Sequence, residues 1–203
     1  MIRYSYSLQR GSVAFRLAIL AVLLFAAALR AQEFTLQLDP TQTKIEYSLG
    51  STLHTVHGTF ALKSGDVRFD PTNGKMNGTI IVDATSGESG DRSRDVRMHR
   101  EILESAKFSE IVFTPTQLAG AVAPEGGSKV EVSGQLRLHG QEHAMTFPIE
   151  VKAQGRNLQI SSHIEIPYLQ WGLKNPSNFL LRVSDRVAID IRATGRLQSL
   201  ENR

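Results

Sequence analysis

The chain has 203 residues, with 23 basic side chains, 20 acidic side chains and no cysteine. The lack of cysteine excludes disulfides and a thiol-linked lipid anchor, so the stability of an exported form must come from its core. Four of the 23 basic residues lie within the first 31 positions, so the rest of the chain has 19 basic and 20 acidic residues. This near balance of charge excludes the concentrated basic surface needed to bind nucleic acid.

The first 31 residues have the composition of a secretory signal peptide. They contain four arginines and no acid, and residues 17–29 form an unbroken apolar run. This run is shorter than the roughly 20 residues that cross a membrane, and its end is rich in small residues, so we expect cleavage after Ala28 or Ala31. Arg30 beside this site keeps an uncleaved N-terminal anchor as the alternative. The predicted organisation is a signal peptide at 1–31 and one folded domain at 32–203, in the periplasm or secreted.

From Phe34 onward, apolar residues recur at every second position, which is the period of a strand with one buried face. The alternating segments are 34–38, 45–49, 60–62, 67–69, 76–82, 111–113, 130–138, 145–151, 158–166 and 187–191. Residues 63–66 and 70–74 are predicted hairpin connections, the second because its Asn-Gly pair accepts positive φ angles. Eight to ten short strands normally close into a barrel or fold into a sandwich. We predict an all-β fold, a single antiparallel β-barrel of about eight strands.

One segment, residues 91–106, has helical spacing of its apolar residues. Asp91 or Ser93 can cap its start. Two pairs of opposite charge with a spacing of four can line its exposed face, Arg97 with Glu101 and Arg100 with Glu104. We expect this short helix to close or flank one end of the barrel.

Motifs for catalysis or metal binding are weak. His54 and His57 are three apart, and His139 and His143 flank a predicted turn at 140–142. Neither pair belongs to a set of four ligands with the spacing of a structural zinc site. Residues 87–90 do not complete the G-x-S-x-G motif of a nucleophile elbow, and no glycine-rich phosphate loop is present. We therefore expect no catalytic residue, no metal and no cofactor.

A barrel of about eight strands either fills its interior with side chains or holds one small ligand. Several inward positions carry phenylalanine or methionine, and unbranched methionine adapts to flexible apolar ligands. Gly58, Gly78 and Gly134 lie inside predicted strands, where glycine leaves room or marks a bend. Periodicity alone does not decide between an interior filled by side chains and one that holds a ligand.

Several motifs together suggest a family. They are SRDVRMH at 93–99, AKFSEIVF at 106–113, GQLRLHG at 134–140 with MTFP at 145–148, and VSDRVAIDI at 183–191. With these motifs, the chain resembles the YceI-like family, lipocalin-like periplasmic proteins associated with binding polyisoprenoid lipids, from about Phe34 to Leu197. It departs from the family at Ser109-Glu110, where Tyr-Pro is usual, and in a longer loop at 168–181.

The resemblance implies an extended barrel with a long apolar channel and neither metal nor catalysis. We predict an exported carrier that sequesters an elongated apolar ligand, a polyisoprenoid lipid or an isoprenoid quinone-like molecule. The residues expected to line the channel are Phe60, Phe69, Met76, Ile80, Phe108, Phe113, Leu136, Met145 and Phe147. The candidates for binding a polar head group are Arg94, Arg97 and His99. Transient contact with a membrane is expected, and the oligomeric state is left open, a homodimer included.

Two other functions fit the same pattern. A non-catalytic interaction module would have a filled barrel and would bind another exported protein through the loop at 168–181. An enzyme acting on a lipid would require a polar cluster inside the barrel.

Overall fold

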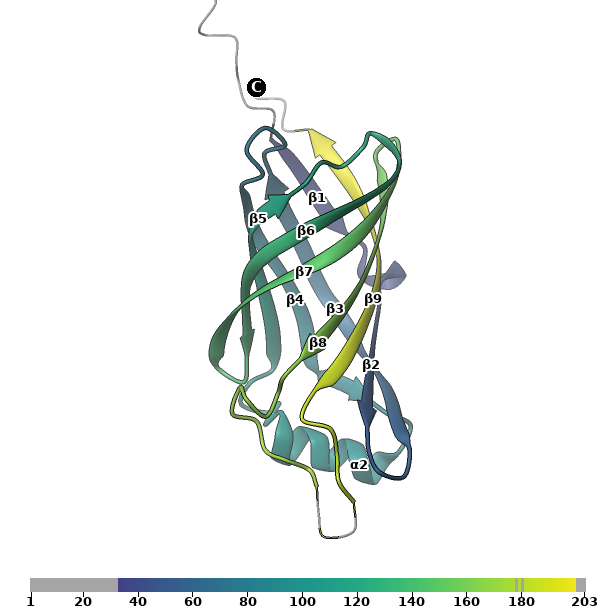
Figure 1. The fold of residues 1–203 in the computed structure, drawn as a ribbon, viewed down its shortest axis with the longest axis vertical. Coiled ribbons are helices and arrows are strands. Elements are labelled where there is room, and N and C mark those ends of the chain that lie inside the picture. The colour runs from purple at the N-terminus through teal and green to yellow at the C-terminus, as the bar shows by residue number, and fades with distance from the viewer. Residues whose placement is uncertain (1–32, 178, 180, 200–203) are drawn as a thin grey trace, which may run out of the picture. The chain divides into compact units, whose positions relative to one another are not determined.

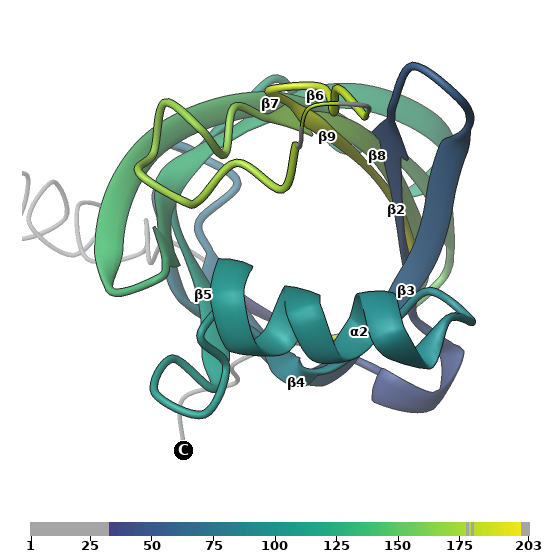
Figure 2. The same cartoon turned by 90° about the horizontal axis from the view of Figure 1, so that it is seen from below.

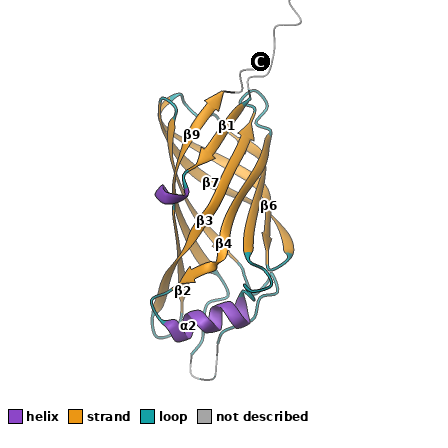
Figure 3. Ribbon diagram, turned by 180° about the vertical axis from the view of Figure 1, so that it is seen from behind, coloured by secondary structure: helices purple, strands orange, loops and turns teal. Residues whose placement is uncertain are grey.

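The computed structural model describes residues 33–177, 179 and 181–199, which form nine strands and two short helical segments (Figures 1 and 3). The elements are β1 (Phe34–Leu38), η1 (Pro40–Gln42), β2 (Lys44–Gly50), β3 (Thr55–Phe69), β4 (Met76–Glu88), α2 (Arg92–Arg97), η2 (Met98–Ile102), β5 (Glu110–Ala119), β6 (Glu125–Leu138), β7 (Gln141–Gln154), β8 (Asn157–Ile166) and β9 (Val187–Ser199). The predicted signal peptide lies outside the described residues. None of the described helices has the length and apolar character that a membrane crossing requires.

The strands form one antiparallel sheet that closes on itself. Its order is β1-β3-β2-β9-β8-β7-β6-β5-β4, and the pairing of β3 with β4 completes the ring (Figure 2). β1 and β2 share one place in this ring, because both pair with β3 on one side and β9 on the other. The ring therefore has eight positions for nine strands, and the predicted all-β antiparallel fold is confirmed.

The predicted hairpin at residues 63–66 is wrong, because β3 continues through it to Phe69. The alternation does change phase there, from Leu62 to Gly65, and the pairing with β4 shifts register between Leu62 and Ser64. An extra residue in one strand makes a bulge with the same loss of phase as a turn. Leu38 of β1 packs over Gly65, where a Cβ atom would lie 2.7 Å from a leucine methyl carbon. The turn at 70–74 is confirmed.

The predicted helix is present and is shorter than expected. The Asp91 carboxylate caps it by accepting a hydrogen bond of 3.0 Å from the backbone N–H of Arg94. Arg97 pairs with Glu101 at 3.2 Å as predicted.

The predicted pairing of Arg100 with Glu104 is wrong. Arg100 contacts the adjacent Glu101 at 2.5 Å. The helix has ended before Glu104, whose φ of 48° turns its side chain off the helical face. The neighbouring histidine turn also differs from the prediction. It consists of His139 and Gly140, both with positive φ, and β7 begins directly at Gln141.

The two ends of the ring differ in how they are covered. At the closed end, near the turns at 70–74 and 155–156, the interior is packed by Leu118, Val130, Val151, Ala153 and Leu158, each at most 8% exposed. At the other end, which we call the mouth, α2 and η2 lie across one side of the ring (Figures 1 and 2). The described residues of 167–186 (167–177, 179 and 181–186), here called the covering segment, lie across the other side.

Candidate functional site

A cavity of about 650 Å³ occupies the ring between the mouth and the closed end. Its volume falls in the range of roughly 300–1,000 Å³ that small-ligand pockets have. All nine strands contribute to its wall, because alternation places every second side chain of each strand inside the ring. Nearly all of these side chains are aliphatic, aromatic or methionine.

Strand β7 shows how the interior changes along the ring. Its inward side chains at the mouth half, His143, Met145, Phe147 and Ile149, are only partly buried, although they point into the ring. Val151, two residues further on, is 3% exposed. The difference arises because Met145, Phe147 and Ile149 line the cavity, whereas Val151 faces other side chains. The interior is therefore hollow toward the mouth and filled at the closed end.

Most hydroxyl groups of the cavity wall are already hydrogen-bonded within the protein. Thr43 donates to the Asp39 carbonyl at 2.8 Å, and Ser162 donates to the Pro148 carbonyl at 2.7 Å. Tyr168 donates to the Ser184 carbonyl at 2.7 Å, and the Tyr47 hydroxyl lies 3.6 Å from the sulfur of Met98. A polar group of a ligand placed beside them would have to compete with these bonds. The wall therefore favours a ligand that is apolar along most of its length.

Tyr47 connects the wall to the helix. Its ring lies over Gly58 of β3, where a Cβ atom would come within 2.4 Å of the ring. Glycine is thus the residue that lets the ring lie flat against the neighbouring strand. Burial raises the pKa of the Tyr47 hydroxyl, so the neutral form prevails at the cavity wall.

Polar and charged lining residues gather at the mouth. They are Asp91, Ser93, Arg94 and Arg97 at the helix, with Ser51 and His54 at the turn between β2 and β3. Arg94 is held by Ser89, since its Nε donates to the serine hydroxyl at 2.7 Å and a terminal nitrogen donates to the carbonyl at 3.0 Å. Arg97 contacts Glu101 through Nε, which leaves its terminal nitrogens directed elsewhere. The mouth is therefore the end suited to a polar head group.

Seven of the nine side chains predicted to line the channel lie on the cavity wall, namely Phe60, Met76, Ile80, Phe113, Leu136, Met145 and Phe147. Phe69 and Phe108 lie elsewhere. Phe69 is at the end of β3 and stacks on Phe34 with ring centroids 5.7 Å apart. Phe108 follows η2 and packs against His139 with centroids 4.5 Å apart. Both are half-buried, which shows that alternation identifies a face without giving the depth of a residue in the ring.

Of the three head-group candidates, Arg94 and Arg97 lie on the cavity wall and His99 does not. The His99 Nε2 lies 2.8 Å from the Gly87 carbonyl, and Nδ1 lies 2.9 Å from the Ser105 hydroxyl. A carbonyl only accepts, so Nε2 donates to it and Nδ1 accepts from the serine. Both ring nitrogens are thus engaged, and His99 links the helix to β4 instead of facing a ligand.

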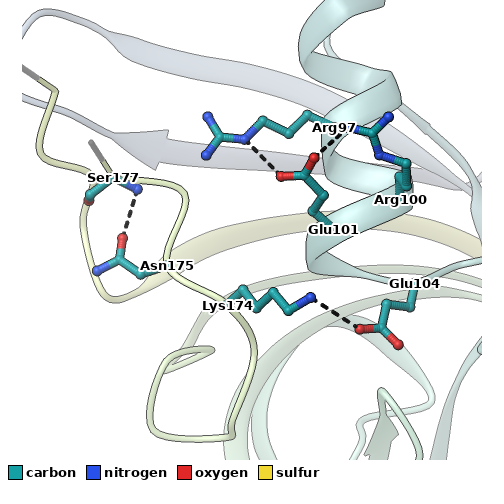
Figure 4. Close-up of polar contacts among 7 residues, drawn as sticks. All are labelled: Arg97, Arg100, Glu101, Glu104, Lys174, Asn175 and Ser177. Atoms are coloured by element: carbon teal, nitrogen blue, oxygen red, sulfur yellow. Dashed lines mark hydrogen bonds and ion pairs between the residues drawn. The ribbon is translucent and has the colours of Figure 1, made fainter. Parts of the chain in front are cut away.

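The covering segment contacts the mouth through aromatic packing, an ion pair to the helical side and backbone hydrogen bonds to the β2–β3 turn. Tyr168 and Leu173 are buried in the cluster that closes over this end. Trp171 stacks on His143 with ring centroids 4.1 Å apart. Lys174 reaches across to Glu104, just beyond η2, with a nitrogen–oxygen distance of 3.7 Å (Figure 4). Strand alternation predicts an inward position for Tyr47. It does not predict the contacts of Trp171 or Lys174, because these residues lie outside the strands.

The histidines of the two pairs considered for metal binding contact different neighbours. His139 packs on Phe108, His143 stacks on Trp171, and the Nδ1 of His57 contacts the Ser48 hydroxyl at 2.9 Å. Within the described ranges, no group of three or more histidine, cysteine, aspartate or glutamate side chains is placed to hold a metal ion.

Comparisons of the sequence and of the fold with known proteins agree with one another. The model of the YceI-like domain matches residues 36–195. A UPF0312 protein of Vibrio campbellii is 29% identical over 152 residues, covering 72% of this chain and 74% of the relative. The fold is similar to that of BcnA from Burkholderia cenocepacia, with a TM-score of 0.64, 18% identity, and coverage of 77% of this chain and 98% of BcnA. It is also similar to a polyisoprenoid binding domain from Saccharophagus degradans implicated in plant cell wall breakdown, with a TM-score of 0.62, 17% identity, and coverage of 80% and 98%.

Proposed function

This chain belongs to the YceI-like family, and from that premise we propose that it is an exported carrier that sequesters an elongated apolar lipid inside its ring of strands. The ligand class is a polyisoprenoid lipid or an isoprenoid quinone-like molecule. The observation that carries the proposal is the cavity of about 650 Å³ with an apolar wall on which most hydroxyl groups are hydrogen-bonded internally.

Burial of apolar surface supplies the affinity. Each Å² of apolar ligand surface removed from water contributes roughly 25 cal/mol, before the costs of association and ordering are subtracted. The lining residues extend from His54 at the mouth to Leu36 near the closed end, and this extent favours a chain-like ligand over a compact one. The similar structure from Saccharophagus degradans is a polyisoprenoid binding domain, and this likeness supports the same ligand class for the present cavity.

We expect the polar end of the ligand to lie at the mouth. Arg97 and Ser93 are lining side chains there that offer donors. The closed end cannot accept a polar group at low cost, because its packed side chains offer no partner and unpaired burial of a polar group is unfavourable. The lipid therefore enters tail first, with its head group beside α2.

Export is part of the proposal and is supported by the composition of the first 31 residues. The location proposed is the periplasm or the exterior of the cell. Radiolabelled or tagged precursor converted to a shorter mature form in the exported fraction would support it, and retention of the full-length chain at the membrane would favour an uncleaved anchor.

Fluorescence quenching tests the cavity directly. In a Trp171→Phe background, which removes the only tryptophan of the chain, Phe147→Trp places a reporter on the cavity wall. Titration with solanesol, a long isoprenoid alcohol, should change its emission to saturation at one ligand per chain. The matched control is Thr146→Trp, whose side chain is exposed on the outside of the same strand and should not respond. No response at either position would contradict the proposal.

The competing interaction module requires a filled interior, which the hollow half of the ring does not provide. An enzyme acting on a lipid would be favoured only by turnover of the bound molecule. Recovery of solanesol unchanged after long incubation with the protein separates a carrier from such an enzyme.

A further inference from the structure

Three large apolar side chains are exposed around the mouth. Leu53 is 76% exposed, Val96 is 50% exposed and Phe179 is fully exposed. They belong to three separate elements, the turn between β2 and β3, the helix α2 and the covering segment. Each of these elements also contributes residues to the cavity wall, so the three side chains surround the opening of the cavity.

The three elements project from the same end of the ring. In Figure 1, α2, the turn between β2 and β3 and the covering segment all lie beyond the ends of the strands at the mouth. Two of them are joined by backbone hydrogen bonds, from Thr52 N–H to the Arg182 carbonyl at 2.9 Å and from Ser184 N–H to the Gly50 carbonyl at 2.8 Å. Leu53 therefore lies beside the covering segment, and α2 faces both across the opening in Figure 2.

Basic side chains accompany these apolar ones. Arg92 and Arg100 are four residues before and after Val96, so all three share the outer face of the helical segment, and all three are exposed. Arg182, three residues after Phe179 in the sequence, is also exposed. The acidic residues of the helix are engaged with the protein itself. Asp91 caps the helix, Asp95 accepts from Ser89, and Glu101 pairs with Arg97 and Arg100.

We propose that Leu53, Val96 and Phe179 dock the mouth onto the surface of a lipid bilayer that contains anionic lipid. The proposal rests on the carrier function proposed above and names the source from which the carrier takes its ligand. Isolated apolar side chains next to cations insert into the boundary between head groups and acyl chains, and the cations are attracted to anionic lipid. Docking lets an apolar ligand pass between the bilayer and the cavity without crossing water.

The exposed side chains of Leu53, Val96 and Phe179 around the mouth, here called the rim, suit a bilayer better than a protein partner. A stable protein interface buries about 800 Å² on each side in continuous, complementary contact. Here the apolar side chains stand on three elements with the opening of the cavity between them. A fluid surface accommodates such separated points, and it is also where an elongated apolar ligand is dissolved.

Single-cysteine labelling measures docking without altering the rim as a whole. The chain has no cysteine, so a polarity-sensitive fluorophore can be attached at Val96→Cys, with Arg156→Cys in the exposed turn of the closed end as the control. Vesicles of phosphatidylethanolamine and phosphatidylglycerol should shift the emission of the first label and leave the second unchanged. Vesicles of phosphatidylcholine alone should give a weaker shift, and salt should reduce the shift on anionic vesicles.

Transfer assays connect docking to function. The variants Leu53→Asp, Val96→Asp and Phe179→Asp should each weaken vesicle binding by about tenfold, the effect of withdrawing one apolar side chain from the interface. The triple variant should take up solanesol from vesicles much more slowly than the wild type. It should bind solanesol delivered in detergent with unchanged capacity, because the cavity is intact. Ala121→Asp, an exposed apolar-to-acid change at the closed end, should have neither effect.

The outcomes separate the two proposals. If detergent-delivered solanesol does not bind even to the wild type, the carrier function fails. If it binds but the wild type ignores vesicles, or the triple variant docks and transfers as well as the wild type, the docking proposal is overturned. A photo-crosslinker at Leu53 that captures one protein in the exported fraction, with no vesicle binding, would assign the rim to a protein partner and would also overturn it.

Discussion

At the closed end of the ring, Val151 and Ala153 of β7 are each 3% exposed and pack against Val130 and Leu158. Six residues earlier in the same strand, Met145 points inward in the same way but faces the cavity. The two regions have the same alternation, the same strands and the same inward apolar face. They differ in what lies opposite those side chains. An alternating sequence thus specifies which face is inside, whereas the packing of the whole ring decides whether the inside is solid or hollow.

The largest expected difference between the two regions is in stability. Leu158→Ala removes contacts in the packed end and should lower the free energy of unfolding by about 2–5 kcal/mol. Met145→Ala should cost about 1 kcal/mol, because one side of this residue already faces open space. Chemical denaturation of the ligand-free variants measures both. Equal losses would mean that the interior is filled at both ends.

Filling the hollow half should affect binding more than folding. Ile160→Trp puts a larger side chain into the cavity, which reduces the space for a ligand, and should weaken solanesol binding by at least about tenfold. The free energy of unfolding should change by less than the roughly 1–3 kcal/mol that overpacking a solid core costs. Gln159→Trp, on the outer face of the same strand, is the control. Unchanged affinity of Ile160→Trp, measured by displacement of a fluorescent lipid, would place the ligand elsewhere.

Two tyrosines at the mouth half and one aspartate near the closed end should respond to opposite extremes of pH. Burial raises the pKa of Tyr47 and Tyr168 at the mouth half. Stability from these groups is therefore complete below their unfolded pKa of about 10 and falls as the pH rises through their folded pKa. Near the closed end, hydrogen bonds led by Thr72 lower the pKa of Asp70. Its contribution is complete above its unfolded pKa of about 3.9 and is lost as the pH falls.

Thermal unfolding across pH measures both effects. The double variant Tyr47→Phe with Tyr168→Phe should flatten the loss of stability on the alkaline side only. Asp70→Asn should flatten it on the acidic side only. If either substitution altered stability at both extremes of pH, the assignment of the alkaline loss to the two tyrosines and of part of the acidic loss to Asp70 would be contradicted.

The smallest expected effect concerns the ion pair that joins the covering segment to the helix. Glu104→Gln removes the attraction to Lys174, and exposed pairs of this kind contribute about 0–1 kcal/mol. Unfolding should therefore change little, while hydrogen exchange in the covering segment should quicken. Lys129→Gln, which breaks an ion pair with Glu150 on the outside of the ring, is the control and should leave the covering segment unchanged. A loss well above 1 kcal/mol in Glu104→Gln would show that the pair holds the fold itself.

Most of the fold could be predicted from the period of two, because burial of one face of each strand imposes it locally. Phe60, Leu136 and Phe147 were assigned to the inward face by this rule alone. The bulge near Gly65 could not be distinguished from a turn, since both interrupt the alternation by one residue. Its identity depends on Leu38, which is distant in sequence and packs over it.

The candidate site was less predictable because depth and orientation are tertiary properties. Phe69 has the right phase but lies at the end of its strand against Phe34. His99 lies close in sequence to Arg97, yet its ring is fixed by Gly87 and Ser105, which no local pattern reveals. The covering segment has no period at all, so the stacking of Trp171 on His143 has no sequence signal.

The central claim is that the hollow half of the ring carries an apolar ligand. Native mass spectrometry of the mature protein purified from its exported fraction, followed by organic extraction and identification of what is released, tests it most directly. We expect one prenyl lipid or quinone per chain, and a loss of that mass in Ile160→Trp. A protein that is recovered empty and that also ignores added isoprenoids would contradict the account.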